Sequence, residues 1–304
     1  MPTVLAARPP LKIAFGNAPA AVFDLGLPVL AGETTEAVVP AVRAAGRGGS
    51  YSLFQAEGWL LGVAGVSITG GLEEATRRLY AEMFHAARGL RCARIWNYVP
   101  AINECAEGGV ENYQVFCRGR SLAFEQELGT SFKNFVPSAS AVGSRADELR
   151  VVFAATEATM RHIENPLQVP AYDYPREYGS RAPSFARATV VSEGERLTVF
   201  ISGTAAIRGH ATFAPGDTRR QLDCTLENLH ELSLACGLGP QFDAGPGATR
   251  HFKVYLRHAE DQPWVAMILE ERLLVSGDRV TYLQADICRA RLNVEIEATL
   301  TTRR

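Results

Sequence analysis

The pattern of apolar and polar residues predicts strands and long helices along most of the chain. Tyr51–Ile68 reads as two strands around the turn Glu57-Gly58, and Leu72–Arg88 as a helix with its apolar residues on one face. A similar order returns later, with two strands in Ala188–Gly203 and a leucine-faced helix at Asp217–Cys236. The other expected elements are strands at Arg94–Val99, Leu149–Thr156, His251–Leu256 and Val280–Leu283, and helices at Val110–Leu128 and Trp264–Leu274.

The two halves of the chain therefore look alike. Each runs through a strand pair, a long helix ending at a glycine (Gly89 or Gly237), a strand and a second helix. The small, polar segment Ser131–Gly143 is the expected join, which gives an N-terminal half at residues 1–140 and a C-terminal half at 141–304. Residues 1–50, rich in Pro, Ala and Gly, stay poorly defined. Two similar α/β units side by side favour a site in the C-terminal half and at the interface.

The chain closes on a strand that carries two carboxylates on one face. Side chains alternate from Leu292 onward, because successive strand residues point to opposite faces. The two faces hold Val294, Ile296 and Ala298 on one side and Asn293, Glu295, Glu297 and Thr299 on the other. Such a polar face is either solvated or the floor of a polar site, and the alternation alone favours the solvated face.

Composition excludes several classes of protein. A 47% hydrophobic, 21% charged chain of net charge -2 is typical of a globular protein without a basic surface for nucleic acid. No apolar run is long enough for a membrane span, and Met1–Pro10 lacks the apolar core of a secretion signal. The six cysteines have no CxxC spacing, and GxGxxG, GxxxxGK[ST] and HExxH motifs are absent. We therefore expect a cytoplasmic protein without a zinc site or a disulfide framework.

Several blocks of the sequence resemble a known family. Gly216-Asp217, Gln221 and Leu226-Glu-Asn228, with the closing strand, resemble the RidA (YjgF) family. The whole chain is similar to the chorismatases, which are built on RidA-like units, in the blocks Arg94–Glu104, Phe116–Arg120, Asn165–Tyr172, Tyr174–Arg187 and Ile201–His210. The resemblance implies an α/β (α+β) fold of two RidA-like, chorismate mutase-like halves with mixed sheets packed against long helices. It also implies no metal and no organic cofactor.

The resemblance implies chorismate as the substrate and pyruvate as a product. Chorismate carries a ring carboxylate, a ring hydroxyl and an enolpyruvyl ether, and cleavage of the ether needs a proton on the methylene carbon. A carboxylic acid can deliver that proton if a dry site raises its pKa. Glu295 matches the family's acid. Glu297 is the alternative donor, or a neighbour that raises the pKa of Glu295.

Substrate-binding candidates come from the same blocks. Arginine suits carboxylates because its fork binds both oxygens. The blocks supply Arg120, Arg181 and Arg187, while Arg94 is interpreted as structural. The remaining candidates are Tyr98, Tyr178, Ser202, Gly203, Thr204 and Ala205. The alternatives are tyrosines that satisfy their own hydroxyls and a strand bend at Gly203.

Cys288 precedes Glu295 by seven residues, and the resemblance associates a cysteine here with hydroxybenzoate formation. The alternative is a small core residue. An odd spacing places the two on opposite faces of a regular strand, so a bulge or turn must separate them if both reach one site. We expect 3-hydroxybenzoate as the ring product. Because Ala205-Ala206 departs from the family pattern, a mixed or 4-hydroxybenzoate outcome stays open. The dihydrodiol 3,4-dihydroxycyclohexadienoate, made by water, is a further alternative.

Two interpretations of another class also stay open. A RidA-like imine deaminase would need only the C-terminal half, and a non-catalytic small-molecule binder would need no acid. Neither nucleic acid nor membrane is an expected partner. The chain is expected to be a monomer or a RidA-like trimer.

Overall fold

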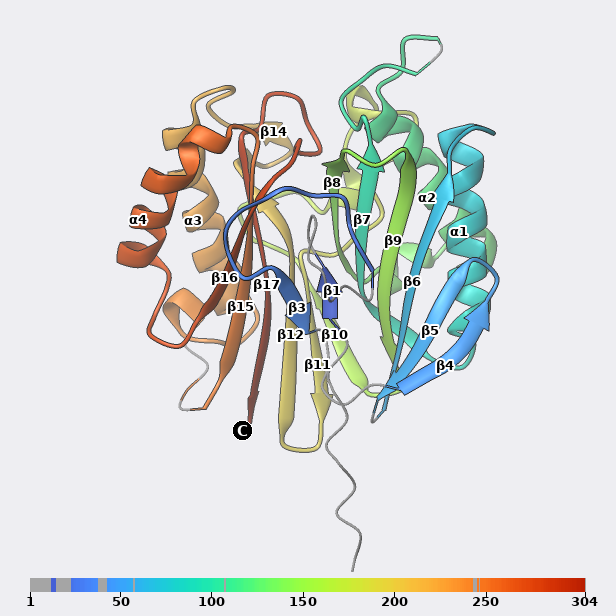
Figure 1. Ribbon diagram of the computed structural model, residues 1–304, viewed down its shortest axis with the longest axis horizontal. Coiled ribbons are helices and arrows are strands. Elements are labelled where there is room, and N and C mark those ends of the chain that lie inside the picture. The colour runs from blue at the N-terminus through green and yellow to red at the C-terminus, as the bar shows by residue number, and fades with distance from the viewer. Residues whose placement is uncertain are drawn as a thin grey trace, which may run out of the picture.

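Two β-sheets lie face to face, with a pair of helices on the outer face of each, in the computed structural model (Figure 1). The structure describes residues 12–14, 23–37, 43–56, 58–106, 108–242, 245 and 247–303. Helices α1 (Leu72–Ala86) and α2 (Asn112–Leu128) cover the first sheet, and α3 (Thr218–Ala235) and α4 (Gln262–Arg272) cover the second. Three apolar clusters fill the space between the sheets and beneath each helix pair. No described helix is long and apolar enough to span a membrane.

The first sheet belongs to the N-terminal half. Its strands are β4 (Arg43–Gly48), β5 (Tyr51–Ala56), β6 (Trp59–Ser67), β7 (Arg91–Pro100), β8 (Ser138–Ser144) and β9 (Glu148–Thr156). They lie in the order β4-β5-β6-β9-β7-β8. β7 and β8 pair in parallel, because α2 carries the chain back between them, and the other described pairs of this sheet are antiparallel.

The second sheet repeats this order and adds one strand at its edge. Its strands are β10 (Thr159–Ile163), β11 (Ala188–Glu193), β12 (Arg196–Ala205), β15 (Thr249–Leu256), β16 (Arg279–Gln284), β17 (Val294–Arg303) and β2 (Val29–Gly32). The order is β10-β11-β12-β17-β15-β16-β2, and β15 and β16 pair in parallel as β7 and β8 do. The internal repeat predicted from the sequence is therefore confirmed.

Shorter elements lie outside the two large sheets. β1 (Lys12–Ala14) pairs with β3 (Thr35–Ala37), and β13 (Ile207–Arg208) pairs with β14 (Ala211–Thr212). Short 3₁₀ turns occupy Phe132–Phe135, Ala171–Asp173, Arg176–Tyr178, Pro240–Phe242 and Ala259–Asp261. The N-terminal segment passes in front of the space between the two sheets in Figure 1, and its strand β2 pairs with β16 at the edge of the second sheet.

The division between the halves lies later than residue 140. That position falls inside β8, and β9 also belongs to the first sheet, so the change of sheet comes after Thr156. The small, polar residues of Ser131–Gly143 suggested a join, but most of that segment's second half belongs to β8, whose seven residues are all buried. They are small because β8 packs closely against the second sheet, where the backbone N–H of Ala139 donates to Oγ of Ser202 at 2.9 Å.

The ends of α3 show why the helix prediction succeeded. The Asp217 side chain accepts a hydrogen bond from the backbone N–H of Arg220 at 3.1 Å and so caps the first turn. Gly237 follows the helix with a φ of 80°, a left-handed conformation that favours glycine. The intervening leucines are buried beneath the helix: Leu222, Leu226, Leu229 and Leu232.

Candidate active site

The polar face of β17 is buried between the two sheets. Val294, Ile296 and Ala298 pack toward α3 and α4, so the alternate residues face the first sheet. Glu295 and Glu297 are only 3% and 1% exposed. The solvated face that the alternation favoured is therefore wrong, and both carboxyl groups lie in the interior.

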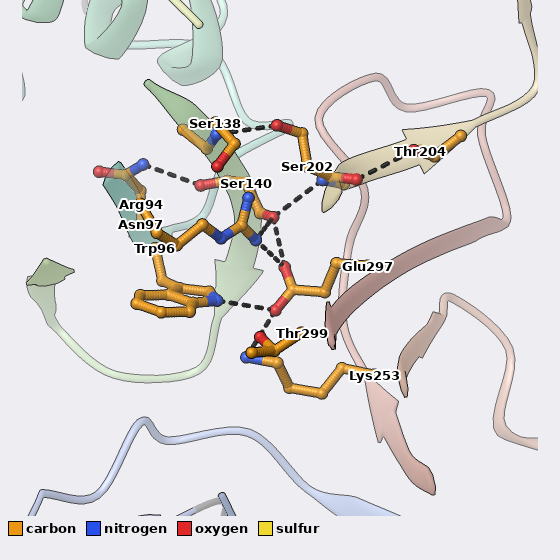
Figure 2. Close-up of polar contacts among 12 residues, drawn as sticks. Arg94, Trp96, Asn97, Ser138, Ser140, Ser202, Thr204, Lys253, Glu297 and Thr299 are labelled. Atoms are coloured by element: carbon orange, nitrogen blue, oxygen red, sulfur yellow. Dashed lines mark hydrogen bonds and ion pairs between the residues drawn. The ribbon is translucent and has the colours of Figure 1, made fainter. Parts of the chain in front are cut away.

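Glu297 is held by donors from both sheets (Figure 2). Its carboxylate accepts hydrogen bonds from Nη2 of Arg94 at 2.7 Å, Nε1 of Trp96 at 2.9 Å and Oγ of Ser140. Nζ of Lys253 lies 2.5 Å from Oε1 of Glu297. Burial raises the pKa of Glu297, but Lys253 and Arg94 outweigh that effect and lower it to about 2. Glu297 is thus a permanent anion, and Arg94, interpreted as structural, is one of its buried partners.

Glu295 has the opposite environment. Its Oε1 is buried and has no hydrogen-bond partner among the described residues. Burial, and then the neighbouring Glu297 carboxylate, raise the pKa of Glu295 to about 8, while Arg94 and Arg187 act in the lowering direction. Glu295 is therefore a neutral acid with a free oxygen at pH 7.

A bulge in β12 makes room for the Glu295 side chain. Ile201 pairs with Ala298 and Thr204 with Ile296, so β12 carries one extra residue here. A Cβ on Gly203 would overlap Oε1 of Glu295, which explains the glycine.

Ser202 and Thr204 shape this bulge and are not among the residues that line the cavity beside Glu295. The hydroxyl of Ser202 donates to the carbonyl oxygen of Ala186 at 2.6 Å, and that of Thr204 to the carbonyl oxygen of Ser202 at 2.9 Å. Both side chains are buried in backbone contacts. Their hydroxyls therefore hold the backbone of the bulge, while Gly203 and Ala205 line the cavity beside Glu295.

That cavity has a volume of about 300 Å³ and is built by both halves. The start of α2 supplies Tyr113, the segment before β11 supplies Tyr178 and Arg187, and the loop before β17 supplies Cys288 and Arg289. A smaller chamber of about 20 Å³ lies between Arg120 and Glu295 and shares several lining residues with the larger one. The larger volume suits a small organic molecule.

Aromatic rings hold two buried arginines at the cavity. The guanidinium of Arg120 lies 5.1 Å from the Phe116 ring and 5.7 Å from the Phe185 ring, and its Nε and Nη2 have no hydrogen-bond partner among the described residues. The guanidinium of Arg187 lies 5.1 Å from the same Phe185 ring, on which both arginines therefore rest. Arg187 also donates to the Tyr174 hydroxyl at 2.8 Å. Buried, unpaired guanidinium nitrogens are expected to bind an anion.

Arg289 is a third cation of the cavity, which the sequence analysis missed. Its guanidinium lies 4.1 Å from the Tyr178 ring and donates to the carbonyl oxygen of His210 at 2.9 Å. Its place beside Cys288 in the chain is the one signal that could have pointed to it.

Arg181 and Tyr98 do not reach the cavity. Arg181 forms an ion pair with Glu125 of α2 at 2.7 Å, with about a third of each side chain exposed, and is not among the residues that line the cavity. Tyr98 is 1% exposed between the sheets, and its charged neighbours are Lys253 and Glu297. Burial raises the pKa of Tyr98, and the residue belongs to the packing around Glu297.

The turn that Cys288 requires is present. The backbone N–H of Leu292 donates to the carbonyl oxygen of Arg289 at 3.0 Å, and the segment ahead of β17 is not a strand. Two side chains hold this turn in place. Arg257 donates to the carbonyl oxygen of Arg289 at 3.1 Å, and Asn103 of the first half donates to the carbonyl oxygen of Ile287 at 3.0 Å. Cys288 and Glu295 consequently line the same cavity. Burial, and then Glu295, raise the pKa of Cys288 to about 12, so it stays a thiol.

Two residues of the C-terminal motifs support the cavity from α3. Gln221 accepts the backbone N–H of Asn293 at 2.7 Å and so fixes the start of β17. Asn228 donates to the carbonyl oxygens of Ala205 at 2.9 Å and Ile207 at 3.1 Å, beyond the bulge. These amides position the backbone on both sides of Glu295.

Comparisons with known proteins agree with this geometry. Residues 38–155 match the family described as chorismatase FkbO/Hyg5-like, N-terminal. The chain is 42% identical to a 3-hydroxybenzoate synthase of Streptomyces hygroscopicus over 241 residues, which covers 75% of this chain and 70% of that protein. It is 37% identical to a chorismatase of the same organism over 248 residues, covering 79% and 71%. A chorismatase crystal structure superposes with a TM-score of 0.77 at 28% identity, covering 97% of this chain and 99% of that one. The chain belongs to the chorismatase family.

Proposed function

We propose that this enzyme converts chorismate to 3-hydroxybenzoate and pyruvate. The observation that carries the proposal is Glu295, a neutral carboxylic acid with a free oxygen, buried beside a cavity that arginines line. A relative that covers three quarters of the chain is named for the same product.

The charges of the cavity suit a dianion. Arg120 lies at the small chamber, and Arg187 and Arg289 line the larger cavity. Arginine binds a carboxylate through two parallel hydrogen bonds, and aromatic rings hold these three side chains in place. We assign them to the two carboxylates of chorismate.

Glu295 starts the reaction by protonating the enolpyruvyl methylene carbon. The resulting oxocarbenium ion makes the ether a good leaving group, and the neighbouring ring hydroxyl displaces it from the ring. This step forms pyruvate and a ring oxide, which opens to the phenol. The proton lost by the ring hydroxyl restores Glu295, so the reaction consumes no water. The fixed charge of Glu297 favours the protonated form of Glu295 between turnovers.

Cys288 is assigned to the choice between the ring hydroxyl and water. As a neutral thiol beside Glu295, it occupies space where a water molecule would reach the ring. Its Sγ also offers a weak hydrogen bond to the ring hydroxyl.

We expect Cys288→Ala to keep most of the pyruvate release and to shift the ring product away from 3-hydroxybenzoate. The smaller side chain admits a water, which needs only about 10–15 Å³. Chromatography of the ring products measures the ratio. Cys236→Ala, a buried cysteine at the end of α3, is the matched control. An unchanged ratio in Cys288→Ala would mean that the cysteine is only a packing residue.

Incubation with chorismate, followed by a pyruvate assay, separates the three classes of function. A chorismatase releases one pyruvate for each chorismate consumed. An imine deaminase releases ammonia from an imine and leaves chorismate intact, and a binding protein consumes neither. A cytoplasmic location and a monomeric or trimeric state remain predictions from the sequence.

A further inference from the structure

The buried cluster around Glu297 includes a carboxylate from the N-terminal segment. Glu36 of β3 is 1% exposed, and its Oε2 lies 2.8 Å from Nζ of Lys253. The hydroxyl of Thr299, on the polar face of β17, donates to its Oε1 at 3.4 Å. Glu36 precedes residue 38, where the family match begins. The cluster is thus completed by a segment that the sequence motifs did not reach.

Lys253 is shared between two carboxylates. Its Nζ lies 2.5 Å from Glu297 and 2.8 Å from Glu36, and Arg94 lies on the other oxygen of Glu297 (Figure 2). These four side chains are at most 2% exposed. Two cations and two anions sum to zero. Without Glu36, the same cluster would carry one positive charge on the strand face that also carries Glu295.

We propose that Glu36 is a positioning residue for the acid chemistry, because it neutralises Lys253 and so leaves the negative charge of Glu297 effective at Glu295. The proposal rests on the proposed function, in which Glu295 must be protonated. A net positive cluster would stabilise the ionised carboxylate of Glu295 in a medium of low dielectric constant. The N-terminal segment therefore takes part in setting the pH range of the enzyme.

The other groups that face the cluster do not supply this charge. His251 donates or accepts at the Thr281 hydroxyl, 2.9 Å away, and burial lowers its pKa. Burial raises the pKa of Tyr98 and Tyr255, so neither ionises near neutral pH. At the outer edge, Arg279 and Glu33 pair with each other at 3.2 Å. The groups that face Glu295 itself are Glu297, Arg94, Arg187, Arg120, Tyr113 and Cys288.

One further group titrates in the same range. Burial raises the pKa of Glu164 to about 7, and its carboxyl lies 4.0 Å from Arg187. Glu164 is present in every variant described below, so its titration contributes equally to all of their pH profiles. The informative quantity is consequently the difference between variants in the pH dependence of kcat/KM.

Glu36→Gln should move the alkaline limb of kcat/KM to lower pH by about half to one unit. Glu36 contacts β17 at Thr299, which lies four residues after Glu295 in the chain. Four residues of a strand span about 13 Å, which estimates the distance between the Glu36 charge and Glu295. A unit charge at that distance shifts a pKa by about this amount. The sign follows because an acid that must be protonated loses activity as the pH rises through its pKa. The loss should be about threefold to eightfold near pH 8.5 and small near pH 6.

Three further variants make the test decisive. Lys253→Met removes a positive charge and should move the limb to higher pH, and Glu36→Gln combined with Lys253→Met should return it toward wild type. Glu33→Gln, an exposed carboxylate of the same segment, should leave the profile unchanged. If the lysine variants do not fold, as judged by circular dichroism, the comparison of Glu36→Gln with Glu33→Gln still decides the question.

A limb that stays in place in Glu36→Gln, or a loss of rate that is equal at every pH, would overturn the proposal. The second result would indicate a merely structural contact. Failure of the proposed function looks different, since the wild-type protein would then release no pyruvate at any pH.

Discussion

Glu295→Gln should reduce pyruvate release from chorismate by at least about 100-fold, which is the usual contribution of a general acid. Glutamine keeps the shape of the side chain and removes the proton that the methylene carbon must receive. A coupled assay for pyruvate measures the rate, and binding of the unreacted substrate should persist. The loss should be present across the pH range, because no form of glutamine donates as a carboxylic acid does.

The same variant should be more heat-stable than wild type near pH 8. A glutamate whose folded pKa is raised above its unfolded value costs stability once the pH exceeds the unfolded value, and burial raises the pKa of Glu295 to about 8. Glutamine does not ionise and avoids that cost. A higher melting temperature would show that lost activity is not lost folding. Near-normal activity in Glu295→Gln, together with an inactive Glu297→Gln, would mean that the other carboxylate is the donor.

Arg120→Met should weaken chorismate binding by about 1.5–3 kcal/mol, or about 10- to 150-fold in Kd. The guanidinium is buried, and two of its nitrogens have no hydrogen-bond partner among the described residues, so a carboxylate would be their first full partner. Methionine keeps the apolar stem between the rings of Phe116 and Phe185. Calorimetry in the Glu295→Gln background measures the affinity, because the substrate is then not consumed.

Arg181→Met is the matched control for this experiment. Arg181 belongs to the same set of sequence candidates, but it pairs with Glu125 at the surface and does not line the cavity. Its replacement should leave the affinity unchanged. Equal affinities in both variants and the parent, or a loss confined to Arg181→Met, would reject the assignment of Arg120.

Much of the fold could be predicted because local patterns determine it. The pairing of β5 with β6, the leucine face of α3 and the glycine at its end each have a short-range cause, while Glu57 of the predicted turn lies outside the described residues. The repeat emerged from the order of these elements alone. The join between the halves did not, because the small residues of β8 serve close packing between sheets and resemble those of a linker.

The candidate site could be predicted only in part. The alternation of side chains along the strand predicted which residues share a face with Glu295. That this face is buried follows only from the packing of the opposing sheet against it. The need for a turn after Cys288 followed from strand geometry and is confirmed. Arg289 and Glu36 could not be predicted as site residues, because each contacts the site through residues that are distant in the sequence.

Labelling of pyruvate from solvent tests most directly whether an acid that exchanges with solvent, the role given to Glu295, protonates the methylene carbon. The carboxyl proton of Glu295 exchanges with solvent, so turnover in D₂O should give pyruvate with one deuterium in its methyl group. Immediate reduction to lactate prevents later exchange, and mass spectrometry counts the label. One deuterium per pyruvate is the predicted result. Unlabelled pyruvate would mean that the hydrogen came from the substrate's own ring, and would contradict the role given to Glu295.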